Sequence, residues 1–196
     1  KAGWADSVKT LMHNLYDGQN VYFNYDSIRG EGARLKTMGG RASGPQPLIK
    51  LHDFIREIMH NAQGRKLTAL EAHDICNQIA EIVVVGGVRR SSQISLSDLD
   101  DKEMRHAKDW PYPIKRAMAN NSAIYRAQPS AAEFLKEWAS LALSGTGERG
   151  IFNLEAAQSK APSRRYSPKI QGTNPCGEIM LRDMQFCNLS EGVIRE

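Results

Sequence analysis

Several features that assign a chain to a well-defined class of protein are scarce in this sequence. It has three cysteines in 196 residues. This odd number does not suit a secreted disulfide-linked domain, so we expect a reducing cytoplasm as its compartment. No apolar run approaches the roughly 20 residues that a membrane-spanning helix needs, and no signal-peptide pattern opens the chain. The sequence therefore predicts no membrane association.

Positive charge is modest and scattered. The net charge is +4, and no basic run is long or interleaved with aromatic residues. This pattern favours small anionic ligands over direct nucleic-acid binding. No C-x-x-C pair occurs and the five histidines follow no ligand spacing, so we predict no metal site. We expect His52, His60 and His73 to be partly exposed helix residues.

Segments with helical spacing alternate with short apolar segments, which predicts an α/β fold. Apolar residues recur at helical spacing from Trp4 and from Leu48, and capping boxes open two further helices at Thr68 and Ser130, the second ending near Gly145. The strand candidates are NVYFNY (20–25), IVVVGG (82–87), the alternating residues 94–96 and GIFNL (150–154).

The chain shows no internal repeat, low-complexity segment or convincing linker, so residues 1–196 are expected to form one domain or a piece of one. Residues 27–47 are rich in glycine and basic side chains and predict a loop. The chain begins at Lys1 without a methionine and ends just after an apolar, strand-like run. We expect both ends to continue into a larger protein.

One motif match is misleading. GTGERG, Gly145–Gly150, has the G-x-G-x-x-G spacing of a dinucleotide-binding turn. Such a turn follows a strand and opens a helix, so that the pyrophosphate meets helix N–H groups. Here the predicted order is reversed, and we interpret the segment as a helix C-cap and turn.

Two of the three cysteines lie close together, in QGTNPCGEIML and in FCNLSE. In an extended segment, alternate side chains point the same way, so Asn174, Cys176 and Glu178 are candidates to share one pocket. Cys187 follows Cys176 by eleven residues, which suits a hairpin-like return. The alternative is that both cysteines are buried and act as small hydrophobic residues.

These two stretches resemble the active-site segment of ribonucleotide reductases in residues, order and spacing. SIRGEGARLKTMGGRASGPQPL, VVVGGVRRSSQISLSDLDD, NNS (120–122) and ERGIFN (148–153) resemble the adenosylcobalamin-dependent (class II) branch, in the order found in the family. The resemblance covers nearly the whole chain and corresponds to the central part of a much longer catalytic chain. It implies reduction of ribonucleotides for DNA synthesis, and an α/β barrel of ten strands, in two parallel halves of five, with a central finger loop.

The resemblance also implies residue roles and a cofactor. Cys176, at the fingertip, carries a thiyl radical, Glu178 is the general base and Asn174 holds the ribose hydroxyls and the carboxylate. Cys187 is one of two thiols that reduce the sugar. Adenosylcobalamin is the implied radical source, and a dithiol or thioredoxin-like protein the implied reductant. The second thiol is not expected here, because Cys76 lies at core-like helix spacing and is interpreted as structural.

A regulatory site is implied as well. By resemblance, Arg29 and Lys36 bind the triphosphate of a deoxynucleoside triphosphate effector, and a specificity loop connects that effector to the substrate base. The loop comprises Gly86, Gly87, Val88, Arg89, Arg90, Ser91, Ser92 and Gln93. The substrate is a ribonucleoside di- or triphosphate, and the full-length enzyme is a candidate homodimer.

Other functions remain open from the sequence. The same motif serves class I reductases, which take their radical from a diiron-tyrosyl partner subunit. The glycyl-radical branch is less compatible with Glu178 and the two cysteines. A non-catalytic fragment that binds deoxynucleotides is the alternative outside the enzymes. We expect residues 1–196 alone to be inactive.

Overall fold

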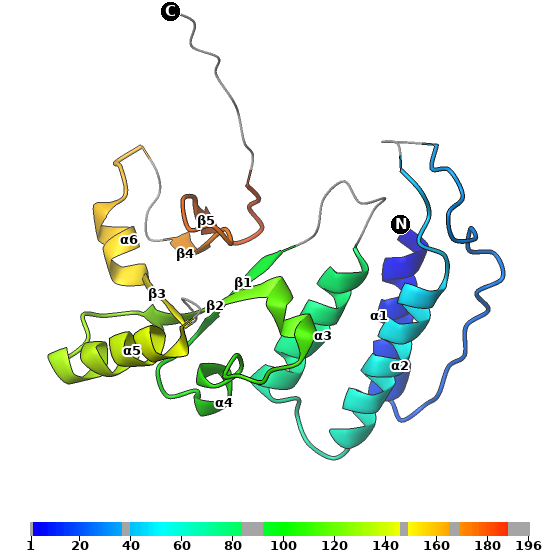
Figure 1. Ribbon diagram of the computed structural model, residues 1–196, viewed down its shortest axis with the longest axis horizontal. Helices are drawn as coiled ribbons and strands as arrows, with labels where there is room; N and C mark the ends of the chain where they lie inside the picture. The colour runs from blue at the N-terminus through cyan, green and yellow to red at the C-terminus, as the bar shows by residue number, and fades with distance from the viewer. Residues whose placement is uncertain (1, 37–39, 84–91, 146–148, 165–168, 188–196) are drawn as a thin grey trace, which may run out of the picture. The chain divides into compact units, whose positions relative to one another are not determined.

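The computed structural model describes residues 2–36, 40–83, 92–145, 149–164 and 169–187 (Figure 1). The chain divides into two compact units. The helical unit comprises residues 1–92 and 113–118, and the sheet unit comprises residues 93–112 and 119–196. The expectation of one domain over 1–196 stays a prediction. Within the described residues, no helix is long and apolar enough to cross a membrane.

Among the described residues, the helical unit consists of three helices, α1 to α3 (Figure 1), and a short 3-10 helix, η1. Their bounds are α1 Ala2–Tyr16, α2 Gln46–Asn61, α3 Ala69–Ile82 and η1 Ile114–Met118. The three long helices confirm the predicted ones, and the capping box of Thr68 and Glu71 begins α3 as expected. Their apolar faces meet in a core of Leu11, Leu48, Leu51, Ile55 and Ile75.

The strand predicted at 20–25 is wrong. The segment has no strand hydrogen bonding, although Val21, Phe23 and Tyr25 do pack on the helical core as the alternation suggested. The carbonyl of Val21 instead accepts a hydrogen bond from the Arg56 guanidinium on α2. Alternating burial therefore arises here from an extended chain lying on helices. The IVVVGG candidate falls largely at 84–87, outside the described residues, and α3 ends at Ile82.

Two of the three histidines expected to be partly exposed are buried, so that prediction was wrong for His52 and His73. Ser7 Oγ donates to the Trp4 carbonyl at 2.8 Å, which leaves it to accept from His52 Nε2–H at 3.0 Å. His52 Nδ1 then accepts from the Tyr25 hydroxyl at 2.7 Å. This series of hydrogen bonds, with Nε2–H as donor and Nδ1 as acceptor, suits a neutral His52 imidazole.

The pKa of His52 agrees with that tautomer. Burial, followed by the positive charge of Arg56, lowers the pKa below its usual value, against a smaller effect of Asp53. A histidine on an apolar helix face is thus accommodated in the core because both ring nitrogens find partners.

The sheet unit contains a parallel sheet of order β1-β2-β3, which confirms the α/β class. Strand β1 (Gln93–Ser97) pairs with β2 (Ala119–Tyr125), and β2 pairs with β3 (Gly150–Asn153). A separate antiparallel pair joins β4 (Ile170–Thr173) and β5 (Met180–Arg182). The helices of this unit are α4 Lys102–Arg105, α5 Ala131–Ser144 and α6 Leu154–Lys160.

The GTGERG segment begins as the sequence indicated. Gly145 caps α5 in the left-handed conformation, with a φ of 65°, and β3 starts at Gly150. Arg149 is buried and pairs with Glu137 of α5 at 3.2 Å, and Arg105 of α4 pairs with the same carboxylate. The segment thus contributes an arginine to a buried ion-pair cluster that joins two helices to the sheet.

Candidate functional site

The NPCG stretch forms the turn of a short hairpin. Thr173 of β4 pairs with Met180 of β5, and the Gly177 N–H donates to the Asn174 carbonyl at 2.9 Å. Asparagine first, proline second and glycine fourth is the composition that type I turns favour. The prediction of an extended segment was wrong here, because this hydrogen bond folds the chain back between the two strands.

Asn174 braces this turn from within. It is buried, and its Oδ1 accepts from the Ile179 N–H at 3.0 Å and from the Thr173 hydroxyl at 3.3 Å. Its Nδ2 lies 3.7 Å from Cys187 Sγ, within hydrogen-bonding reach of sulfur. Cys187 therefore lies against Asn174 at the base of the turn, and the predicted approach of Cys187 to Cys176 itself stays a prediction.

Cys176 and Glu178 lie at the tip of the turn, and both are exposed. Gly177 between them has a φ of 86° and open space where a Cβ would lie. The alternative of buried cysteines is wrong, because all three cysteines are free and exposed. The prediction that Cys76 occupies a core position is wrong for the same reason, since its side chain is exposed on α3.

The hairpin is anchored to the parallel sheet at its base. Ile170 is buried in an apolar cluster with Ile124 of β2 and Leu154 of α6, and its carbonyl accepts from Gln158 Nε2 at 2.8 Å. At Gly172 a Cβ would lie 3.3 Å from the Leu96 side chain of β1. This close approach explains a glycine in the middle of β4.

The basic loop of the helical unit is closed by its own backbone. Leu35 N–H donates to the Gly40 carbonyl at 3.0 Å and Ala42 N–H to the Ala33 carbonyl at 2.7 Å. Arg29 and Lys36 are both exposed, and Arg29 Nη1 lies 3.4 Å from the Arg34 carbonyl. The predicted loop is confirmed for its described residues up to Pro45, since α2 already begins at Gln46, and the two candidate phosphate ligands are exposed to solvent.

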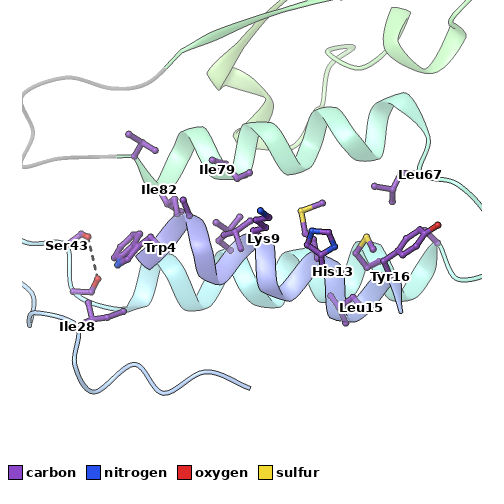
Figure 2. Close-up of a pocket in the computed structure, with 18 of the residues that line it drawn as sticks. Trp4, Lys9, His13, Leu15, Tyr16, Ile28, Ser43, Leu67, Ile79 and Ile82 are labelled. Carbon is purple, nitrogen blue, oxygen red and sulfur yellow. Dashed lines mark hydrogen bonds between the residues drawn. The ribbon is translucent and has the colours of Figure 1, made fainter. Parts of the chain in front are cut away.

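An open groove of about 2250 Å³ runs along α1 within the helical unit. Figure 2 shows Trp4 and Lys9 on α1, with Ile79 and Ile82 of α3 across the groove and Ile28 at one end. The lining is mainly apolar. Among the described residues that line it there is no Asp or Glu, whereas its cationic side chains are Lys9, Arg29, Arg41, Arg65 and Lys66.

The groove therefore suits a ligand with an apolar part and a negative charge. Arg29 belongs to its lining and Lys36 does not, so the structure brings only one of the two predicted effector residues to the groove.

Most of the predicted specificity loop lies outside the described residues, namely Gly86, Gly87, Val88, Arg89, Arg90 and Ser91. The described end of that loop leads into β1, where Gln93 pairs with Ala119. In the described part of the chain, no group of three or more His, Cys, Asp or Glu side chains could hold a metal ion.

Sequence reasoning missed one residue of the site. Asn120 Nδ2 donates to the Pro175 carbonyl at 2.7 Å, across 55 residues of sequence. The sequence marked NNS (120–122) only as a stretch that resembles the family, and no local pattern predicts a partner so distant.

Comparison with known proteins identifies the family. A family model described as the ribonucleotide reductase barrel domain matches residues 88–195. The adenosylcobalamin-dependent ribonucleoside-triphosphate reductase of Lacticaseibacillus paracasei is 38% identical over 97% of this chain and 27% of its own length. The protein of the same name from Lactobacillus leichmannii is 34% identical over 88% of this chain and 24% of its own length. The chain thus spans about a quarter of these curated relatives, and no solved structure matches it significantly.

Proposed function

This chain belongs to the ribonucleotide reductase family, and from that premise we propose that it is a segment of a catalytic chain that reduces ribonucleoside triphosphates to 2′-deoxyribonucleotides. The substrate class and the use of adenosylcobalamin follow the names of the relatives, which favour class II over class I. We further propose that the α/β sheet unit contributes to a ten-stranded barrel, with the Cys176 hairpin as its finger loop.

The observation that carries this proposal is the tip of the hairpin. A free, exposed thiol stands on a turn whose shape is fixed by the buried amide of Asn174. A carboxylate follows two residues later, and a second thiol, Cys187, lies against the same amide. A thiol and a carboxylate at the hairpin tip, with a second thiol against its base, are three of the four groups that the proposed thiol-driven reduction requires.

The tip of the turn is accessible to a large cofactor, because Cys176 is exposed and the space beside Gly177 is open. When bound, adenosylcobalamin supplies the radical that removes the hydrogen atom from Cys176 Sγ. We assign no residue of this chain to holding its corrin ring.

In the proposed reaction, the Cys176 thiyl takes the hydrogen atom from C3′ of the ribose. Glu178 accepts the proton of the 3′ hydroxyl, and the 2′ hydroxyl leaves as water. Asn174, whose amide braces the turn in this structure, holds the ribose hydroxyls. Cys187 and a second thiol become a disulfide and deliver two electrons and two protons, one proton to the departing hydroxyl and one to C2′. Glu178 returns its proton to the 3′ oxygen, and Cys176 returns its hydrogen atom to C3′. The balance is ribonucleotide plus dithiol to deoxyribonucleotide, water and disulfide.

We assign the second thiol to no residue of this chain and propose that the rest of the full-length protein supplies it. A thioredoxin-like protein in the cytoplasm is the proposed reductant of the disulfide. Since residues 1–196 lack one redox thiol, they are proposed to be inactive alone.

A deoxynucleoside triphosphate is the proposed effector. The groove along α1 offers apolar walls for a base and sugar and carries cationic side chains for the phosphates. Arg29 lines the groove, and the roles of Lys36 in effector binding and of residues 86–93 as the specificity loop are proposed from the family resemblance.

Substitution of the tip residues tests the catalytic proposal in the full-length protein. Cys176→Ser should abolish nucleotide reduction while leaving folding intact, because the two side chains are nearly isosteric. Glu178→Gln should slow loss of the 2′ hydroxyl but preserve the change in the visible spectrum of adenosylcobalamin that accompanies radical formation. Deoxynucleotide production and that spectrum are the two measurements.

Cys76→Ser is the matched control, since Cys76 is also free and exposed, and it should retain activity. A Cys176→Ser protein that keeps a tenth of the wild-type turnover would rule out the thiyl role. Turnover that requires an iron-loaded partner subunit instead of adenosylcobalamin would establish class I.

A further inference from the structure

We propose that Asn120 is a positioning residue for the reaction, and that its side chain holds the turn that presents the Cys176 thiol. This inference rests on the proposed function for its catalytic consequence. The contact itself is independent of that function. Asn120 Nδ2 donates to the Pro175 carbonyl at 2.7 Å, a short distance for an amide N–H to a carbonyl oxygen.

The acceptor of this hydrogen bond lies directly beside Cys176, where it affects the orientation of the thiol. The Pro175 carbonyl belongs to the peptide unit that also contains the Cys176 nitrogen. Because a peptide unit is planar, a hydrogen bond to its oxygen fixes the plane from which the Cys176 side chain projects. Asn120 thereby acts on the direction of the thiol without touching it.

Asn120 is itself held firmly. It lies in β2 opposite Ile94 of β1 in the parallel register. The preceding residue, Ala119, is buried, and its carbonyl accepts from Lys108 Nζ at 2.7 Å. The donor is therefore part of a paired strand at the start of β2, and its backbone cannot follow the turn if the turn moves.

The other hydrogen bonds of the turn join residues within the hairpin itself. Gly177 and Ile179 both donate to Asn174, and Asn174 contacts Cys187. These bonds shape the turn internally. Among the described contacts, the Asn120 bond is the one that ties the tip to the parallel sheet, whereas Ile170 and Gly172 anchor only the base of the hairpin.

Loss of this tie should let the turn open more often and shift relative to the sheet. Misplacement of a reacting group by about 1 Å can reduce a rate about a hundredfold. The expected result is a loss in kcat with little change in KM, because the Asn120 side chain acts through its bond to the thiol-bearing turn.

The test uses Asn120→Ala and Asn120→Asp in the full-length protein. Alanine removes the donor, and aspartate keeps the shape but opposes the Pro175 carbonyl with a negative charge. Gln128→Glu is the control, because it makes the same amide-to-acid change at an exposed position beyond the other end of β2. Asn120 is exposed, so both variants should fold, which unchanged hydrogen exchange in residues 93–97 would verify.

The first measurement needs no turnover. Amide hydrogen exchange of residues 174–179 should accelerate at least about threefold in both variants, since the turn opens more often. Alkylation of Cys176 by iodoacetamide should accelerate too, with exposed Cys76 as an internal reference. Unchanged exchange and alkylation in both variants would overturn the proposal.

The second measurement is steady-state kinetics. We expect kcat to fall about tenfold to a hundredfold and KM to stay within about threefold. Accelerated exchange with undiminished kcat would overturn the positioning role. If Cys176→Ser remained active, the proposed function would be wrong, and the exchange and alkylation results would still decide whether Asn120 holds the turn.

Discussion

At the scale of single residues, the buried charged side chains among the described residues each meet a partner of opposite charge. Asp74 of α3 is buried, and both nitrogens of the Arg116 fork reach its carboxylate at 2.8 Å. Lys115, next to Arg116, places its ammonium 3.6 Å from the centre of the Phe54 ring. Together these contacts bind η1 to α2 and α3.

The pKa of Asp74 records this pairing. Burial by itself raises the pKa, but hydrogen bonds from Arg116 and His73 and the nearby positive charges outweigh it and lower the pKa from 3.8 to about 2. A lowered pKa in the folded state stabilises the fold above the unfolded-state pKa. That stability is lost as the pH falls from about 4 toward 2.

Asp74→Asn should therefore reduce the free energy of unfolding by about 2 kcal/mol at pH 7. The difference from wild type should shrink as the pH falls from 4 toward 2, where the wild-type carboxylate is protonated as well. Urea unfolding of the two proteins at pH 7, 4 and 3 measures this. Asp53→Asn, the same change on the exposed side of α2, should have little effect at any of these pH values. A constant difference across the series would contradict the pairing.

At the scale of elements, strand β2 is central to the sheet unit and was not among the strands expected from the sequence. Its sequence ANNSAIY begins with five small or polar residues, which conceal the strand from a hydrophobicity pattern. The strand is nevertheless largely buried, because β1 and β3 pair with its two edges. Small side chains suit β2, because the neighbouring strand β3 approaches it closely at Ser122 and Gly150.

The pairing of β2 with β3 supplies an element-scale prediction. Ser122 lies opposite Gly150, and a Cβ on Gly150 would meet Ser122 Oγ at 2.6 Å. Gly150→Ala should lower the free energy of unfolding by about 1–3 kcal/mol through this overlap. In a Ser122→Ala background the same change should cost much less, because the next nearest atoms are at ordinary contact distance.

A double-mutant cycle measured by chemical unfolding isolates the coupling between the two positions. Equal costs of Gly150→Ala in the two backgrounds would show that the overlap with Ser122 is not the cause.

At the scale of the whole molecule, the proposed effector groove belongs to the helical unit and the proposed catalytic tip to the sheet unit. Regulation then requires a coupling free energy between the two sites, typically about 1–3 kcal/mol. Such coupling is reciprocal for binding, so substrate should change effector affinity by the factor by which effector changes substrate affinity.

Arg29→Ala in the full-length protein should raise the effector concentration for half-maximal activation about tenfold or more, because a charge-assisted contact to phosphate is lost. Turnover without effector should be unchanged. Lys50→Ala removes an exposed cation of α2 that does not line the groove and serves as the control. An unaltered effector constant in Arg29→Ala would place the effector elsewhere.

The sequence by itself determined the features that depend on near neighbours. The capping boxes at Thr68 and Ser130 begin α3 and α5 as predicted, because each joins residues three apart. The long helices and the α/β class followed from apolar spacing. Cys176, Glu178 and Cys187 were singled out from a motif of a few residues, and their catalytic roles stay proposals.

Only the tertiary structure decided which residues meet across long stretches of chain. The burial of His52, the NVYFNY segment lying on helices and the bond from Asn120 to Pro175 each depend on residues that are tens of positions apart. A local sequence pattern cannot predict such partners, because these contacts form only when the helices and strands have packed against one another. A local hydrogen bond shaped the Cys176 turn, whereas the packed sheet decided how that turn is held.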